Sequence, residues 1–110
     1  MAKTIVRYKV KPALVEENEK LIRAVYAELA KVKPAHFSYA TYKLDDGLSF
    51  IHIAEFTGEG KSPLAGINAF AAFQQGVKDR CDVLPAVSQG TEVGSYDSAL
   101  VIENTGWPTQ

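Results

Sequence analysis

The chain contains few of the cysteine and histidine residues that form disulfides and bind metals. Its 110 residues include one cysteine, Cys81, and two histidines, His36 and His52. One cysteine cannot close an intramolecular disulfide, and these three residues have none of the close spacings that assemble a zinc site. The sequence therefore predicts no bound metal, and Cys81 is expected to be a buried structural thiol.

Neither an excess of one charge nor a long apolar run is present. Twelve basic side chains stand against 13 acidic ones, for a formal net charge of −1. This balance does not favour nucleic acid or an anionic membrane as a partner. No apolar stretch approaches the roughly 20 residues that span a bilayer, and the start at Met1-Ala2-Lys3-Thr4 lacks the apolar core of a signal peptide. We expect a cytoplasmic protein.

Apolar residues recur along the chain with a strand period and a helix period in turn. The expected elements are a strand at Thr4–Val10, a helix from about Ala13 to Lys31, strands at Phe37–Leu44 and Leu48–Phe56, a helix from Ser62-Pro63, and a strand between Val87 and Asp97. This order predicts an α+β, ferredoxin-like β-α-β-β-α-β domain over residues 1–97, with a four-stranded antiparallel sheet and helices on one face.

The turn at Asp45-Asp46-Gly47 predicts a hairpin but leaves its register open. A two-residue loop would place Thr41 opposite His52. A three-residue loop with Gly47 in the left-handed conformation would place Ala40 there instead. We favour the three-residue loop, because Asp-Asp-Gly suits a type I turn followed by a left-handed glycine.

A sheet with helices on one face only leaves its other face bare. We therefore expect a homodimer, in which a second copy covers the apolar side chains of that face. Residues 98–110 lie beyond the completed fold, yet they include Leu100, Val101, Ile102 and Trp107. Apolar side chains need cover, so this C-terminal tail is predicted to pack on the dimer.

Three stretches resemble a known superfamily. They are Thr4–Pro12, Phe50–Phe56, and Asn68–Gly76 leading into Val93–Tyr96. They are similar to the dimeric α+β barrel superfamily and, within it, to the antibiotic biosynthesis monooxygenase-like proteins. The resemblance implies a dimeric barrel and a possible cofactor-free monooxygenase activity. The asparagine, tryptophan and histidine of the haem-degrading members have no counterparts here, so the resemblance does not imply haem degradation.

A cofactor-free oxygenase needs a base that removes a proton from a phenol or anthrone-like substrate, and a dry aromatic pocket. His52 is the candidate catalytic base, because it stands mid-strand in an apolar context where a histidine is costly unless hydrogen-bonded. Tyrosines could orient a substrate oxygen, phenylalanines could hold an aromatic ring, and a helical asparagine could bond substrate. These candidates are Tyr8, Tyr39, Tyr42, Phe50, Phe70, Phe73 and Asn68.

The same residues also fit a protein without catalysis. His52 can simply bond a neighbour across the sheet, and phenylalanines at helical spacing are ordinary core residues. The alternative function is thus a dimeric module that binds a small ligand or has only a structural role. An enclosed cavity lined by His52 and at least two tyrosine hydroxyls favours the enzyme, whereas a filled core with His52 bonded to backbone favours the module.

Overall fold

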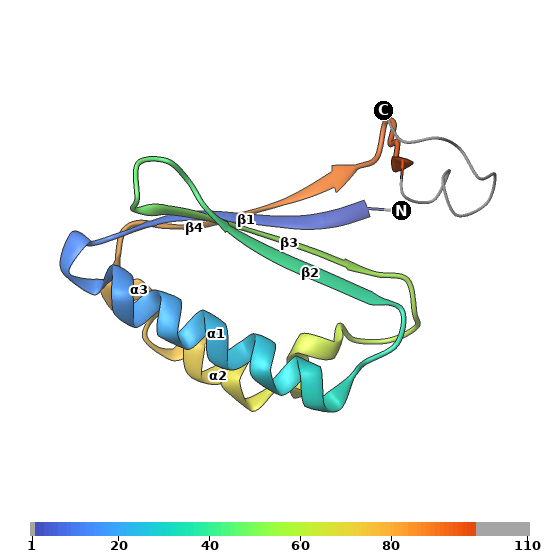
Figure 1. Cartoon of the computed structure of the whole chain (residues 1–110), viewed down its shortest axis with the longest axis horizontal. Helices are drawn as coiled ribbons and strands as arrows, with labels where there is room; N and C mark the ends of the chain where they lie inside the picture. The colour runs from blue at the N-terminus through green and yellow to red at the C-terminus, as the bar shows by residue number, and fades with distance from the viewer. Residues whose placement is uncertain (1, 99–110) are drawn as a thin grey trace.

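The protein has two layers, a four-stranded sheet and a layer of helices that covers one of its faces (Figure 1). The computed structural model describes residues 2–98. Its elements in chain order are β1 (Ala2–Val10), η1 (Pro12–Leu14), α1 (Val15–Val32), β2 (Phe37–Lys43), β3 (Ser49–Phe56), η2 (Pro63–Gly66), α2 (Asn68–Gln75), α3 (Val77–Arg80) and β4 (Cys81–Thr91). Within the described residues, no helix is long and apolar enough to cross a membrane.

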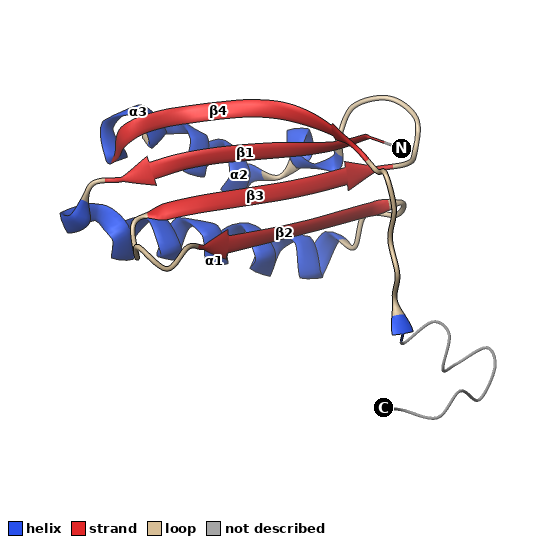
Figure 2. Ribbon diagram, turned by 90° about the horizontal axis from the view of Figure 1, so that it is seen from above, coloured by secondary structure: helices blue, strands red, loops and turns tan. Residues whose placement is uncertain are grey.

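The sheet has the strand order β2-β3-β1-β4, and every neighbouring pair is antiparallel (Figure 2). β1 and β3 lie in the interior of the sheet, because β3 pairs with both β1 and β2, and β4 pairs with the other side of β1. This arrangement confirms the predicted ferredoxin-like fold. The predicted tail lies outside the described residues, apart from Ser98.

Helix α1 and the strands bury the faces that their apolar periods predict. Ile22 and Val25 of α1 are buried against Tyr8 and Val10 of β1 and Phe50 of β3. α1 ends at Lys33, which adopts a left-handed conformation with φ of 52° and donates its backbone N–H to the Leu29 carbonyl. A side chain in that conformation is unusual, and it closes the helix in the way that a glycine often does.

The second helix differs from the single helix expected from Ser62-Pro63. The Ser62 side chain does cap Leu64, but the turn that follows ends at Gly66, and Ile67 is extended with φ of −94° and ψ of 113°. Helix α2 then begins afresh at Asn68. The Glu28 carboxylate of α1 accepts the backbone N–H groups of Asn68 and Ala69 at 3.0 and 2.8 Å, so this first turn is capped from another element.

The last strand lies earlier than expected. β4 spans Cys81–Thr91, so it begins before Val87, includes Leu84-Pro85-Ala86 and ends well before Asp97. Arg7 pairs with Ala86 and Lys9 with Val83, so Leu84 and Pro85 together face the one residue between. This is a bulge on an edge strand, where a proline without an N–H is tolerated.

The β2–β3 hairpin takes the other of the two registers. Thr41 pairs with His52 and Tyr42 with Ile51, so the favoured three-residue loop was wrong. Gly47 is left-handed as expected, with φ of 73°. The Asp46 carboxylate accepts bonds from the backbone N–H of Leu48 and Ser49 and from the Ser49 hydroxyl. These bonds hold Leu48 in the turn. Strand β3 therefore begins at Ser49, one residue later than the three-residue loop requires.

Candidate functional site

His52 lies on the face of β3 that the helices cover. It is 6% exposed, and its pairing partners are Val6 on β1 and Thr41 on β2. Side chains on one face of a strand recur every second residue. Tyr8 and Tyr39, each two residues from a pairing partner of His52, therefore point into the same layer. The sheet register thus brings these side chains around one imidazole ring.

Both ring nitrogens of His52 are hydrogen-bonded to side chains. The Tyr8 hydroxyl lies 2.7 Å from Nε2 and the Tyr39 hydroxyl 2.6 Å from Nδ1. The Thr41 hydroxyl lies 3.2 Å from Nδ1. Three side-chain hydroxyls thus lie within hydrogen-bond distance of the two ring nitrogens, and within residues 2–98 no backbone group bonds to the imidazole.

The bonds continue from Tyr8 into the core. Asn18 of α1 is fully buried and donates from Nδ2 to the Tyr8 hydroxyl at 3.0 Å. Arg80, 6% exposed, donates from Nε to the Asn18 side-chain oxygen at 3.1 Å. Its Nη2 donates to the Phe73 carbonyl at 2.7 Å, and its guanidinium lies 5.0 Å from the Phe73 ring centre. These bonds and the ring contact compensate for burying a cation.

On the other side the bonds reach the surface of α1, where the Tyr26 hydroxyl lies 2.8 Å from that of Thr41. We call this connected set the His52 network. Its members are Arg80, Asn18, Tyr8, His52, Tyr39, Thr41 and Tyr26. Among the described residues, no buried side-chain nitrogen or oxygen lacks a hydrogen-bond partner.

Burial keeps the titratable centre of the network uncharged. It lowers the pKa of His52 from 6.5 to about 4, because the imidazolium would lose its hydration. The same desolvation raises the pKa of Tyr8 and Tyr39 far above the usual value of a phenol. At neutral pH the imidazole and both phenols are therefore neutral, and Arg80 is the charged member of the network.

A cavity of about 300 Å³ lies over this polar cluster, between the sheet and α2. Tyr8, Tyr39 and His52 form part of its lining. The remaining walls are mainly apolar and include Val6, Leu64, Phe70, Phe73, Val77 and Val87. A small aromatic molecule would find ring faces and aliphatic walls here, with hydroxyl groups at one side.

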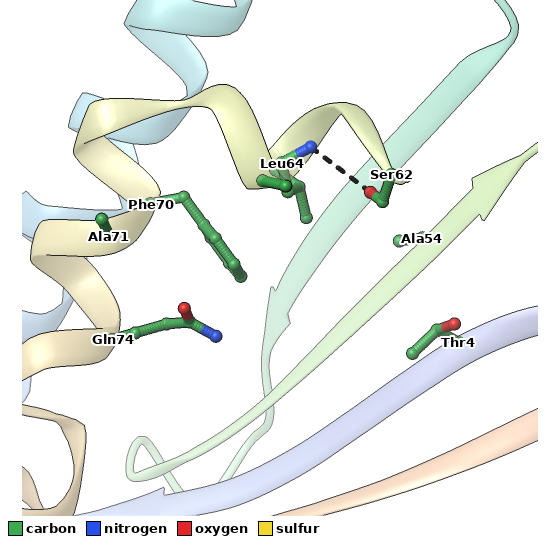
Figure 3. A pocket seen from close by; sticks show the side chains of 8 residues that line it. Thr4, Ala54, Ser62, Leu64, Phe70, Ala71 and Gln74 are labelled. Carbon is green, nitrogen blue, oxygen red and sulfur yellow. Dashed lines mark hydrogen bonds between the residues drawn. The ribbon is translucent and has the colours of Figure 1, made fainter. Parts of the chain in front are cut away.

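A second cavity, of about 400 Å³, adjoins the first. Five residues line both, namely Thr4, Ala54, Leu64, Phe70 and Gln74. Figure 3 shows Phe70 and Gln74 extending from α2 toward the strands that carry Thr4 and Ala54. The shared lining gives room for a molecule longer than a single ring.

The fold of this chain occurs in solved structures. A putative antibiotic biosynthesis monooxygenase from Nitrosomonas europaea matches with a TM-score of 0.66 at 14% identity, over 86% of this chain and 100% of that one. SnoaB, a cofactor-independent oxygenase from Streptomyces nogalater, matches with a TM-score of 0.59 at 17% identity, over 86% and 94%. The chain has the fold of the antibiotic biosynthesis monooxygenase structures.

Proteins without a known role share this monooxygenase fold. One from Nitrosomonas europaea, described as of unknown function, matches with a TM-score of 0.67 at 12% identity, over 86% of this chain and 91% of that one. No protein-family model matches the chain, and no curated protein is similar to it in sequence. The comparisons therefore establish the monooxygenase fold, and the activity has to be argued from the site.

Not all of the predicted site residues meet in the cavity of this monooxygenase fold. Tyr8, Tyr39, His52, Phe70 and Phe73 line it together. The other three predicted side chains lie elsewhere: Phe50 is buried with its ring stacked on Tyr8, Tyr42 is 55% exposed on the opposite face of the sheet, and Asn68 is exposed at the start of α2. That the first five bind a substrate stays a prediction.

Four members of the His52 network were not predicted as site residues: Asn18, Arg80, Thr41 and Tyr26. Asn18 gave a usable signal, because it is an amide in the apolar stripe of α1 and a buried amide needs partners. Thr41 depended on the hairpin register. Within the described residues, no three His, Cys, Asp or Glu side chains are grouped so that they could hold a metal ion.

Proposed function

We propose that this protein is a small cofactor-independent oxygenase that acts on an aromatic or polyketide-like molecule in the His52 cavity. The observation that supports this most is the lining of the cavity, in which His52 and the hydroxyl-bearing Tyr8 and Tyr39 meet apolar walls with two phenylalanine rings. The residues of this lining are among those expected at the site of an enzyme. SnoaB, which has the same fold, is described as a cofactor-independent oxygenase, and this is support by analogy only.

The proposed reaction converts a ring methylene of an anthrone-like substrate into a carbonyl group. Removal of one proton gives an electron-rich enolate, which transfers electrons to dioxygen. One oxygen atom becomes the new carbonyl oxygen. The other leaves as water with the two methylene hydrogens, so the substrate supplies all the electrons and no further reductant is required.

Two hydroxyl groups of the His52 network can take part in this reaction, one by binding the substrate oxygen and the other by accepting the substrate proton. The Tyr39 hydroxyl can donate to the substrate oxygen that becomes negative on deprotonation. The Tyr8 oxygen can accept the substrate proton while its own hydrogen passes to Nε2 of His52, 2.7 Å away. With a His52 pKa of about 4, forming the imidazolium at pH 7 costs roughly 4 kcal/mol. The enolate formed beside it offsets part of this cost in a dry site.

Turnover of dithranol, 1,8-dihydroxyanthrone, tests the proposal. Purified protein in air, without added metal or flavin, should produce 1,8-dihydroxyanthraquinone faster than buffer and faster than heat-denatured protein. Oxygen uptake should equal one molecule for each quinone formed. Saturable dithranol binding with no turnover above these controls would contradict the oxygenase and favour a ligand-binding module, with which the fully bonded His52 network is also compatible.

We also propose that the active form is a homodimer. The sheet face opposite the helices carries two cross-strand rows, Ile5–Ile53–Ala40 and Arg7–Ile51–Tyr42. Helices α1, α2 and α3 lie on the other side of the sheet (Figure 1). An apolar sheet face of this kind is stable when a second copy buries it, with an interface above roughly 2,000 Å².

Sedimentation at micromolar concentration should therefore give a mass of about twice 12.0 kDa. Ile53→Lys places a charge in the middle of the proposed interface and should shift the protein to a monomer. Lys43→Arg, on the helix-covered side of the same sheet, should leave the dimer intact. A wild-type monomer, or a dimer unaffected by Ile53→Lys, would rule out this interface.

A further inference from the structure

We propose that Arg80 fixes the direction of the hydrogen bonds from Asn18 to Tyr39, so that His52 carries its proton on Nδ1 and the site presents a hydroxyl donor to the cavity. Such a site takes a ligand through an oxygen acceptor, either a carbonyl oxygen or an enolate oxygen. The ligand part rests on the proposed function, whereas the proton positions follow from the network alone.

Arg80 must be the donor in its hydrogen bond to Asn18, because a guanidinium donates hydrogen bonds and cannot accept them. Arg80 Nε lies 3.1 Å from the Asn18 side-chain oxygen, and the bond from Nη2 to the Phe73 carbonyl holds the guanidinium in place. The Asn18 oxygen therefore faces Arg80 and its NH₂ group faces Tyr8. The two ends of the amide cannot be exchanged without placing NH₂ against a cation.

The hydrogen bond between Asn18 and Tyr8 in turn determines which ring nitrogen of His52 is the acceptor. Asn18 donates to the Tyr8 oxygen at 3.0 Å, so the Tyr8 hydrogen needs another acceptor. Tyr8 is 2% exposed, and the acceptor within reach is Nε2 of His52 at 2.7 Å. If Nε2 carried a hydrogen instead, the Tyr8 hydroxyl hydrogen would be buried without an acceptor, which is the less stable arrangement. Nε2 is therefore the bare nitrogen.

A neutral imidazole with a bare Nε2 carries its hydrogen on Nδ1. This N–H donates to the Tyr39 oxygen at 2.6 Å, with the Thr41 oxygen as a more distant acceptor at 3.2 Å. The Tyr39 hydrogen then points away from His52. Tyr39 lines the cavity, so its hydroxyl can donate to a ligand oxygen there. Arg80 acts as a positioning residue, three hydrogen bonds away from His52.

Asn18→Asp should reverse the network with almost no change of shape. A carboxylate only accepts, so one oxygen takes the Arg80 bond and the other requires a hydrogen from Tyr8. The Tyr8 oxygen then accepts from Nε2–H, and the bare Nδ1 accepts from Tyr39. The cavity would face a Tyr39 oxygen whose hydrogen is already used. Gln75→Glu, on the exposed side of α2, adds the same charge outside the network and serves as the control.

Long-range ¹⁵N–¹H NMR of the imidazole distinguishes the two proton positions, and His36→Gln identifies the signals of His52. We expect Nδ1–H in the wild type and in Gln75→Glu, and Nε2–H in Asn18→Asp. A wild type with Nε2–H overturns the inference without any need for the variant to fold. An unchanged proton position in a folded Asn18→Asp protein also overturns it.

Binding of anthraquinone, whose oxygens are acceptors only, tests the ligand part. Asn18→Asp and Tyr39→Phe should each weaken binding about tenfold, the loss of one hydrogen bond, whereas Gln75→Glu should bind like the wild type. Unchanged binding in both network variants would overturn the acceptor assignment even if dithranol is turned over. Absence of dithranol turnover together with the expected losses of binding would overturn the oxygenase and leave this inference standing.

Discussion

His52→Phe should lower dithranol turnover about 100-fold or more, the typical contribution of a positioned acid or base. The phenyl ring retains the volume and the apolar contacts of the imidazole but has no nitrogen to receive the Tyr8 hydrogen. It also leaves the Tyr8 and Tyr39 hydroxyls without their shared partner. We expect the variant to fold with a loss of about 1 to 3 kcal/mol, so turnover should be measured where circular dichroism shows the folded state.

A pair of tyrosines provides the matched control for this prediction. Tyr39 lines the cavity, whereas Tyr42 lies on the other face of the same strand and is 55% exposed. Tyr39→Phe should lower turnover at least tenfold, and Tyr42→Phe should leave it unchanged. Equal turnover in the wild type and in a folded His52→Phe protein would exclude His52 from the chemistry.

Acid titration of stability provides an independent check on the state of His52. Its pKa of about 4 in the folded protein lies below the 6.5 of an exposed histidine. The unfolded chain therefore takes up a proton at higher pH than the folded one. The free energy of unfolding should be highest above pH 6.5 and fall by roughly 3 kcal/mol toward pH 4 from this group alone. His52→Phe should lack this part of the pH dependence.

Arg80→Met should produce a large loss of stability, about 3 kcal/mol. The methionine fills much of the same space but donates no hydrogen bonds. The Asn18 side-chain oxygen and the Phe73 carbonyl would be left buried without donors, each at a cost of about 1 to 3 kcal/mol. Urea unfolding at a fixed protein concentration should show a lower midpoint with an unchanged slope.

Arg23→Met is the control for this substitution. The Arg23 side chain is 70% exposed and lies 3.6 Å from the Glu19 carboxylate, so its ion pair is of the weak surface kind. We expect its free energy of unfolding to stay within about 0.5 kcal/mol of the wild type. A similarly small change for Arg80→Met would show that the network does not depend on the arginine.

The layout of the fold could be predicted because each element carries a local signal. β1 alternates apolar and polar residues over Val6–Val10, α1 repeats its apolar residues at helical spacing, and Pro12 and Pro34 lie just outside α1. These patterns depend on which face of an element is buried. The burial of Tyr8 and Val10 on one side of β1 follows directly from them.

The predictions that failed depended on contacts between distant parts of the chain. The β2–β3 register was set by the bonds of Asp46 to Ser49 and the backbone, which turn composition alone does not determine. The last strand was expected only from Val87 onward, yet β4 includes Pro85, because β4 lies at the sheet edge and forms a bulge there. The restart of α2 at Asn68 relies on Glu28, which is 40 residues earlier.

The same distinction holds for the candidate site. His52, Tyr8 and Tyr39 could be proposed because a histidine within an apolar strand needs partners and the neighbouring strands supply tyrosines. Their meeting with Arg80 could not be predicted. The hydrogen bond between Asn18 and Arg80 joins residues that are 62 positions apart in the sequence. Arg80 also lies on α3, a helix of four residues without an apolar period.

A crystal structure with 1,8-dihydroxyanthraquinone, the product of the proposed reaction, would show directly whether the substrate site lies at His52. We expect the ring system between the sheet and the rings of Phe70 and Phe73, with a ligand oxygen within about 3.2 Å of the Tyr39 hydroxyl. The Tyr8 and His52 side chains should keep their bond to each other beneath it. A cavity filled by side chains of the second copy, or a ligand bound only elsewhere, would contradict a substrate site at His52.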